Sequence, residues 1–125
     1  MTVTSDVRAN IKVLVVEDGE DQRFLLQRYF ELEDCDVTST DSAETAMKAF
    51  AESAPDIAVI DLVLPGMNGW DFAAQIEKVW PSCVVVISSV LDVDSYPVAY
   101  AQLTKPVTRA KVQRVLEGFG PGRAA

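Results

Sequence analysis

The sequence contains no histidine and only two cysteines, Cys35 and Cys83. The absence of histidine excludes His-based catalytic triads, His-ligated zinc sites and a role as a phosphohistidine carrier. The two cysteines lie far apart and outside any CxxC pair, which indicates reduced structural thiols rather than a zinc knuckle or a disulfide scaffold. Any chemistry must therefore depend on carboxylates, hydroxyls and lysine.

Long hydrophobic runs and basic clusters are also missing. The longest apolar run, 83–87, is far shorter than the roughly 20 residues that span a bilayer, and residues 1–10 lack the apolar stretch of a signal peptide. We therefore expect a cytoplasmic protein that does not bind a membrane. Eleven Lys and Arg against 19 Asp and Glu give a net charge of -8, which would repel nucleic acid phosphates, so nucleic acid is not an expected partner.

The chain does contain two alternating hydrophobic patterns over a length typical of one domain. Short runs rich in Val and Ile at 11–16, 57–60 and 83–87 predict buried parallel strands, and the more polar run 37–40 predicts an edge strand. Apolar stripes predict helices within 25–32, 43–54, 72–80 and 112–119, the second opened by a capping box of Asp41 and Glu44. The alternation indicates a doubly wound α/β domain. We expect this domain at 11–118, between an N-terminal leader (1–10) and a flexible C-terminal tail (119–125).

Acidic residues stand where two of the predicted strands end. Glu17 and Asp18 follow the first strand, and Asp61 follows the third. Ligands of open α/β sheets bind at the carboxyl ends of the strands, where these three carboxylates would converge if those strands are neighbours. Clustered carboxylates repel one another unless a cation offsets them, and oxygen ligands with room for water suit Mg²⁺. A single acidic residue after a strand needs no such explanation, but three together predict a magnesium site.

Hydroxyls and a lysine follow the remaining strands. Ser88 and Ser89 end the fourth apolar strand, and Lys105 with Pro106 ends a final short stretch, 102–104. A lone lysine is usually a solvated surface charge. A lysine that shares one sheet edge with a hydroxyl and a metal site instead predicts a pocket for a phosphoryl group.

This pattern resembles the response regulator receiver domain over about residues 11–118. The run 55–69, PDIAVIDLVLPGMNG, matches the family around its acceptor aspartate almost position by position. The family's other marks are an acidic pair, a Ser or Thr and a Lys-Pro pair, matched here by Glu17, Asp18, Ser88, Lys105 and Pro106. The resemblance implies a flavodoxin-like fold with a five-stranded parallel sheet of order 2-1-3-4-5. In that order Cys35 and Cys83 are too far apart to form a disulfide.

The resemblance also implies a function in two-component signalling. Asp61 would accept a phosphoryl group from a phosphohistidine on a sensor histidine kinase or a histidine phosphotransfer protein, and the chain would signal to a protein target that the sequence does not identify. Lys105 would pair with the phosphoryl group, and Ser88, rather than Ser89, would donate a hydrogen bond to it. Mg²⁺ would be held by Asp18 and Asp61, by Glu17 through water, and by the carbonyl of Val63.

One segment departs from the family pattern. Ser88 and Lys105 are only 17 positions apart, and Pro97 would interrupt a helix between them, so we expect a shortened or missing fourth helix. Gln102 stands where receivers usually carry a switch aromatic, and Tyr100 is a possible substitute. We hypothesise that 89–100 becomes ordered on phosphorylation.

Two other functions can be weighed against this one. A phosphohydrolase of the haloacid dehalogenase type would need a second acid two residues after Asp61, where Val63 stands. A degenerate receiver that only docks to partners, and is never phosphorylated, remains the alternative. The complete set of site residues argues against it.

Overall fold

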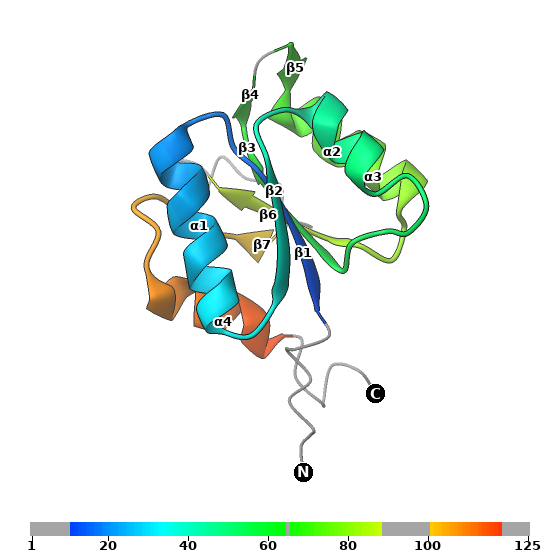
Figure 1. Cartoon of the computed structure of the whole chain (residues 1–125). Helices are drawn as coiled ribbons and strands as arrows, with labels where there is room; N and C mark the ends of the chain where they lie inside the picture. Colours follow the sequence, from blue (N-terminus) through cyan, green and yellow to red (C-terminus); the bar gives the residue numbers. More distant parts are fainter. Residues whose placement is uncertain (1–10, 65, 89–100, 119–125) are drawn as a thin grey trace.

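The computed structural model describes residues 11–64, 66–88 and 101–118, and its largest feature is a parallel β-sheet (Figure 1). The sheet consists of β1 (Lys12–Val16), β2 (Asp36–Thr40), β3 (Ile57–Asp61), β6 (Val84–Ser88) and β7 (Ala101–Gln102). Its order is β2-β1-β3-β6-β7, with every pairing parallel. Counted along the chain, this is the predicted order 2-1-3-4-5, so the doubly wound fold class is confirmed.

Four helices cover the two faces of the sheet. Within the described residues they are α1 (Glu20–Leu32), α2 (Ala43–Ala49), α3 (Gly69–Val79) and α4 (Arg109–Glu117). Figure 1 shows α1 and α4 on one side of the sheet and α2 and α3 on the other. This is the predicted α/β layering. Helices cover both faces of the sheet because each strand carries apolar side chains on both of its faces.

Alternate residues of β1 belong to two different cores. Val13 and Val15 pack in the core under α1 and α4, together with Phe30 and Leu116. The intervening side chains of β1 join the opposite core under α2 and α3. Since successive side chains of a strand point to opposite faces, an uninterrupted Val and Leu run is what a doubly covered strand requires.

The second helix begins and ends differently from the prediction. Its N-cap is Ser42, whose Oγ accepts a hydrogen bond from the Thr45 amide at 3.2 Å, so the capping box expected from Asp41 is wrong by one residue. The helix ends at Ala49, although the apolar stripe continues to Ala54. Sequence periodicity alone does not show where the backbone leaves the helix.

A small hairpin that the sequence did not predict follows β3. It pairs β4 (Val63–Leu64) with β5 (Met67–Asn68) in antiparallel fashion. Gly66 in its turn has a φ of 75°, in the left-handed region that favours glycine. The hairpin leads directly into α3, whose N-cap Asn68 accepts a hydrogen bond from the Trp70 amide at 2.7 Å.

Several sequence predictions concern residues outside the described ranges. These are the shortened or missing fourth helix and the ordering of 89–100, the place of Tyr100, and the leader and tail at 1–10 and 119–125. Gln102, which stands where receivers usually carry the switch aromatic, is described: it lies in β7, is half-buried and pairs in register with Ile87. Cys35 and Cys83 are both buried and form no disulfide with each other, as predicted. None of the described helices has the length and apolar character needed to cross a membrane.

Candidate phosphoryl-acceptor site

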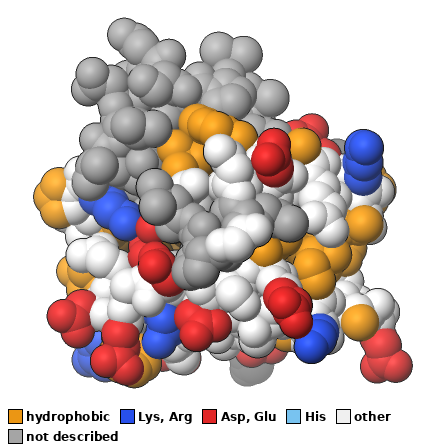
Figure 2. Space-filling view, turned by 90° about the horizontal axis from the view of Figure 1, so that it is seen from above, with side chains coloured by type: hydrophobic (Ala, Val, Ile, Leu, Met, Phe, Trp, Pro, Cys, Tyr) orange, Lys and Arg blue, Asp and Glu red, His pale blue; other side chains and the backbone are white. Residues whose placement is uncertain are grey.

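The predicted site residues meet at the carboxyl edge of the sheet. Glu17 and Asp18 directly follow β1, while Asp61 and Ser88 are the last residues of β3 and β6. Because β3 lies between β1 and β6, these side chains converge, and Asp61 and Ser88 are direct register partners. Viewed onto this end of the molecule, acidic and basic side chains stand interspersed in the described part, and Lys and Arg form no continuous patch there (Figure 2).

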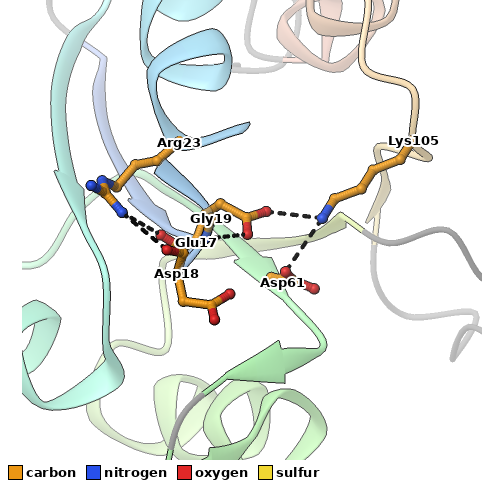
Figure 3. Close-up of polar contacts among 6 residues, drawn as sticks. All are labelled: Glu17, Asp18, Gly19, Arg23, Asp61 and Lys105. Carbon is orange, nitrogen blue, oxygen red and sulfur yellow. Dashed lines mark hydrogen bonds and ion pairs between the residues drawn. The ribbon is translucent and has the colours of Figure 1, made fainter. Parts of the chain in front are cut away.

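Lys105 reaches this edge from the turn after β7. Its Nζ lies 3.0 Å from Glu17 Oε1 and 3.3 Å from Asp61 Oδ2 (Figure 3). The Lys105 side chain is only 17% exposed, so these ion pairs are poorly screened by water. The ammonium therefore stands between two carboxylates that come from two different strand ends.

Glu17 is the more deeply buried member of the acidic pair. The residue is 2% exposed, whereas Asp18 is exposed. Burial raises the pKa of Glu17, although the Lys105 ammonium and a 3.0 Å hydrogen bond from the Gly19 amide oppose this shift. Burial alone would lower the pKa of Lys105, but its contacts with Glu17 and Asp61 outweigh burial and raise it. The negative charge of Glu17 thus depends on nearby cations.

Glu17, Asp18 and Asp61 together carry the carboxylate oxygens that a metal ion needs as ligands. One oxygen from each of Glu17, Asp18 and Asp61 lies within 4.8 Å of the others. Bonds from Mg²⁺ to oxygen are about 2.1 Å long, so the three side chains would have to move closer together to bind one ion directly. Three carboxylates and one ammonium also leave two negative charges, which a divalent cation balances. The donor set therefore fits Mg²⁺.

The hydroxyl of Ser88 is completely buried. The residue is 0% exposed, and its Oγ has no hydrogen-bond partner among the described residues. A buried hydroxyl without a partner costs free energy and is uncommon. Its position beside Asp61 means that a group attached to that carboxylate could supply the missing acceptor. Ser89 lies outside the described residues.

Arg23 supports the acidic pair, a role that the sequence did not reveal. Its Nη1 donates to the carbonyls of Glu17 at 3.0 Å and Asp18 at 3.5 Å (Figure 3). In the sequence, Arg23 is one of several charged residues of a helix, and nothing separates it from a solvated surface charge. Its spacing of one helical turn past the acidic loop is the only available signal.

Gly69 keeps the backbone after Asp61 close to α3. A Cβ at this position would lie 2.5 Å from the Asp61 carbonyl oxygen and 2.5 Å from Leu62 Cα. The Gly69 amide donates to the Leu62 carbonyl at 2.9 Å. Only glycine allows this approach of two backbones, which places the start of α3 beside the end of β3.

Comparison with known proteins identifies the family of this α/β domain. Residues 13–117 match the response regulator receiver domain. The chain belongs to this family, whose members act in two-component signal transduction. The resemblance to receiver domains that the sequence indicated is therefore confirmed.

Individual relatives and structures agree with this assignment. The chain is 34% identical over 113 residues to the sensory/regulatory protein RpfC of Xanthomonas campestris pv. campestris, covering 82% of this chain but 16% of RpfC. It is 31% identical over 77 residues to the autoinducer 1 sensor kinase/phosphatase LuxN of Vibrio harveyi, covering 62% of this chain and 9% of LuxN. A receiver domain structure from Clostridium thermocellum has a TM-score of 0.79 at 22% identity and covers 92% of this chain and 98% of that one, which shows the shared fold.

Proposed function

We propose that the chain is a phosphorylation-dependent signalling module whose phosphoryl acceptor is Asp61. The observation that carries this proposal is the arrangement around Asp61. A lysine lies 3.3 Å from its carboxylate, and two further carboxylates complete a set of metal ligands. Its register neighbour is a buried hydroxyl that has no partner among the described residues. In the proposed reaction an anionic nucleophile attacks an anionic phosphoryl group, and the lysine, a metal ion held by the carboxylates and the hydroxyl would each help to offset the negative charge.

Mg²⁺ is the proposed cofactor. Asp18 and Asp61 would bind it directly, Glu17 through water, and Val63, at the start of the hairpin, through its backbone carbonyl. When bound, the ion supplies positive charge that offsets the negative charge of the carboxylates and of the transferring phosphoryl group. The deep burial of Glu17 supports a role behind the direct ligands, since exposed Asp18 is the more accessible of the pair.

In the proposed reaction the donor is a phosphohistidine on a partner protein. A carboxylate oxygen of Asp61 forms a bond to phosphorus while the bond between phosphorus and the imidazole nitrogen breaks, and that electron pair returns to the imidazole. Lys105 would pair with the phosphoryl oxygens, and Ser88 would donate its hydroxyl hydrogen to one of them. Water in the same pocket could later attack phosphorus, so slow self-dephosphorylation is expected.

The donor class is a histidine kinase or a histidine phosphotransfer protein. The names of RpfC and LuxN, a sensory/regulatory protein and a sensor kinase/phosphatase, support this class. The chain spans about a sixth of the length of RpfC, so the activities of whole relatives are not carried over. We also propose that residues 11–118 form the signalling domain and that it works in the cytoplasm, where two thiols that form no disulfide are expected to stay reduced. The net charge of -8 argues against direct binding to nucleic acid.

A docking module that is never phosphorylated is the alternative. It would retain the fold but would have no use for a buried Ser88 hydroxyl beside Asp61 or for a lysine between two acidic strand ends. The Ser88 hydroxyl, which has no partner among the described residues, costs free energy unless a ligand uses it, so we favour the phosphorylated form.

Intact mass spectrometry distinguishes the two functions. The protein is incubated with acetyl phosphate and Mg²⁺, beside an Asp61→Asn variant and a sample with EDTA. The proposal expects a gain of one phosphoryl mass in the wild type that both controls lack. A wild-type mass that stays unchanged would favour the docking module.

A further inference from the structure

Lys111, on the first turn of α4, makes contacts that differ from those of a solvated lysine. Its Nζ donates to the carbonyl of Thr104 at 3.2 Å and to that of Pro106 at 2.9 Å. It also lies 3.4 Å from Thr104 Oγ1. An ammonium has three donors, and all three here are directed to the two residues on either side of Lys105.

The backbone of Lys111 is held in place by a capped helix. Thr108 is the N-cap of α4, and its Oγ1 accepts a hydrogen bond from the Lys111 amide at 3.2 Å. The helix is anchored by Val112 and Leu116, both fully buried. The position of the Lys111 backbone is therefore fixed relative to the core, and only its own side chain separates this backbone from the ammonium.

The turn that Lys111 holds lies between two buried residues. Leu103, before it, is buried and donates to the Ile87 carbonyl at 2.8 Å, and Val107, after it, is also buried. Between these anchors, Thr104, Lys105 and Pro106 lie beyond the last pair of the parallel ladder. The reach of the Lys105 ammonium to Asp61 depends on where this turn lies.

We propose that Lys111 is a positioning residue for phosphoryl transfer, which binds the carbonyls on both sides of Lys105 and so holds the Lys105 ammonium at Asp61. This inference rests on the proposed function, because it assigns Lys111 a part in that reaction. Lys111 touches no reacting atom. Its effect on the rate comes through Lys105, since displacing a group that contacts the transferred phosphoryl by about 1 Å can slow a reaction by up to about 100-fold.

Arg114 provides a matched control. It lies on the same helix three residues later, carries the same charge and lines the same surface hollow of about 390 Å³ with Lys111 and Thr104. Among the described residues it makes none of the contacts to the turn that Lys111 makes. Replacing either side chain by methionine removes one charge from this hollow, but only one replacement releases the turn.

The test measures phosphorylation rates with acetyl phosphate and Mg²⁺ for the wild type, Lys111→Met, Lys111→Arg and Arg114→Met. We expect Lys111→Met to react about 10-fold more slowly. Lys111→Arg, which keeps the donors, should recover most of the rate, and Arg114→Met should stay within about twofold of the wild type. Thermal melts check folding, and Lys111→Gln replaces Lys111→Met if the latter does not fold.

A double-mutant cycle separates positioning from general destabilisation. If Lys111 acts through Lys105, Lys111→Met should cost less than about twofold when Lys105 is already methionine. An unaffected Lys111→Met, no recovery in Lys111→Arg, or the full 10-fold loss repeated in the Lys105→Met background would overturn the role. A wild type that takes up no phosphoryl group would overturn the proposed function as well, whereas these outcomes in a reactive wild type overturn the role of Lys111 alone.

Discussion

Asp61 and Ser88 are register partners at the ends of two adjacent parallel strands, β3 and β6. Asp61 is 8% exposed and pairs with Lys105, whereas the hydroxyl of Ser88 is fully buried without a partner among the described residues. Partners in a parallel ladder project toward the same face, so whatever is attached to Asp61 comes close to Ser88. The sheet register therefore places Ser88 where it could contact the phosphoryl group that we propose Asp61 accepts.

Ser88→Ala should separate stability from function. Removing a hydroxyl that lacks a partner leaves the free energy of unfolding unchanged or raises it by up to about 1 kcal/mol. The phosphorylation rate should instead fall roughly 10- to 100-fold, which corresponds to one charge-assisted hydrogen bond of about 1.5 to 3 kcal/mol. Urea unfolding and acetyl phosphate kinetics measure the two effects.

Thr40→Val is the matched control for Ser88→Ala. Thr40 is also a buried hydroxyl residue at a strand end, but its Oγ1 lies 3.2 Å from the Ser42 carbonyl and 3.5 Å from that of Val15. Its replacement should lower the free energy of unfolding by about 1 kcal/mol. Equal stability losses in the two variants would mean that Ser88 has a structural partner after all.

Gly69→Ala should destabilise the end of β3. Its Cβ would overlap the backbone of Asp61 and Leu62 at 2.5 Å, and backbone atoms cannot rotate away. We expect a loss of about 2 kcal/mol or more in the free energy of unfolding. Gly118→Ala is the control, because among the described residues its Cβ would meet only the Val115 carbonyl at 3.5 Å. A Gly69→Ala variant as stable as Gly118→Ala would disprove the close packing.

Cys83 should be inert in the folded protein. Burial, followed by the negative charge of Asp56, raises the pKa of its thiol to about 12, against about 9 for an exposed thiol. Below pH 9 the folded chain should therefore hold about 10³-fold less thiolate than the unfolded chain. In a Cys35→Ala background, iodoacetamide should modify Cys83 at about that reduced rate relative to the urea-unfolded protein.

The same shift makes stability depend on alkaline pH. The folded-state pKa of Cys83 is raised, so its contribution is fully present below about pH 9 and is lost as pH rises toward 12. Between pH 9 and pH 10.5, the stability difference between the wild type and Cys83→Ala should fall by about 2 kcal/mol. A difference that is constant over this range would contradict the shift.

The two members of the acidic pair should differ in their effect on Mg²⁺. Asp18→Asn removes a proposed direct ligand and should weaken binding on the order of 100-fold, whereas Glu17→Gln, behind a water, should weaken it about 10-fold. Titration of Mg²⁺ against the fluorescence of half-buried Trp70 measures both. Equal affinities in the two variants would count against the division of roles.

The strands were predictable because a short run of consecutive apolar residues is enough to indicate a buried strand. The run predicted at 57–60 became Ile57–Asp61, in which every residue is buried, and the polar run at 37–40 became the edge strand Asp36–Thr40. Continuous β-branched residues have few other stable places in a folded domain. Once the strand order was known from the resemblance, the convergence of Glu17, Asp18 and Asp61 followed.

What the sequence did not predict depends on contacts between distant residues or on the backbone. The donors of Arg23 and Lys111 bind main-chain carbonyls, which every residue carries, so no pattern of side chains marks their targets. The hairpin after Asp61 and the cap at Ser42 are set by backbone geometry of a few residues. The different burial of Glu17 and Asp18 likewise requires the packed structure.

The most direct test of the central claim locates the phosphoryl group. After reaction with acetyl phosphate and Mg²⁺, borohydride reduces an aspartyl phosphate to homoserine, and the modified position is then read by peptide mass spectrometry. Our account predicts homoserine at position 61 alone, with none when Mg²⁺ is withheld. Homoserine at position 18 or elsewhere in place of 61, or no reduced residue at all, would contradict it.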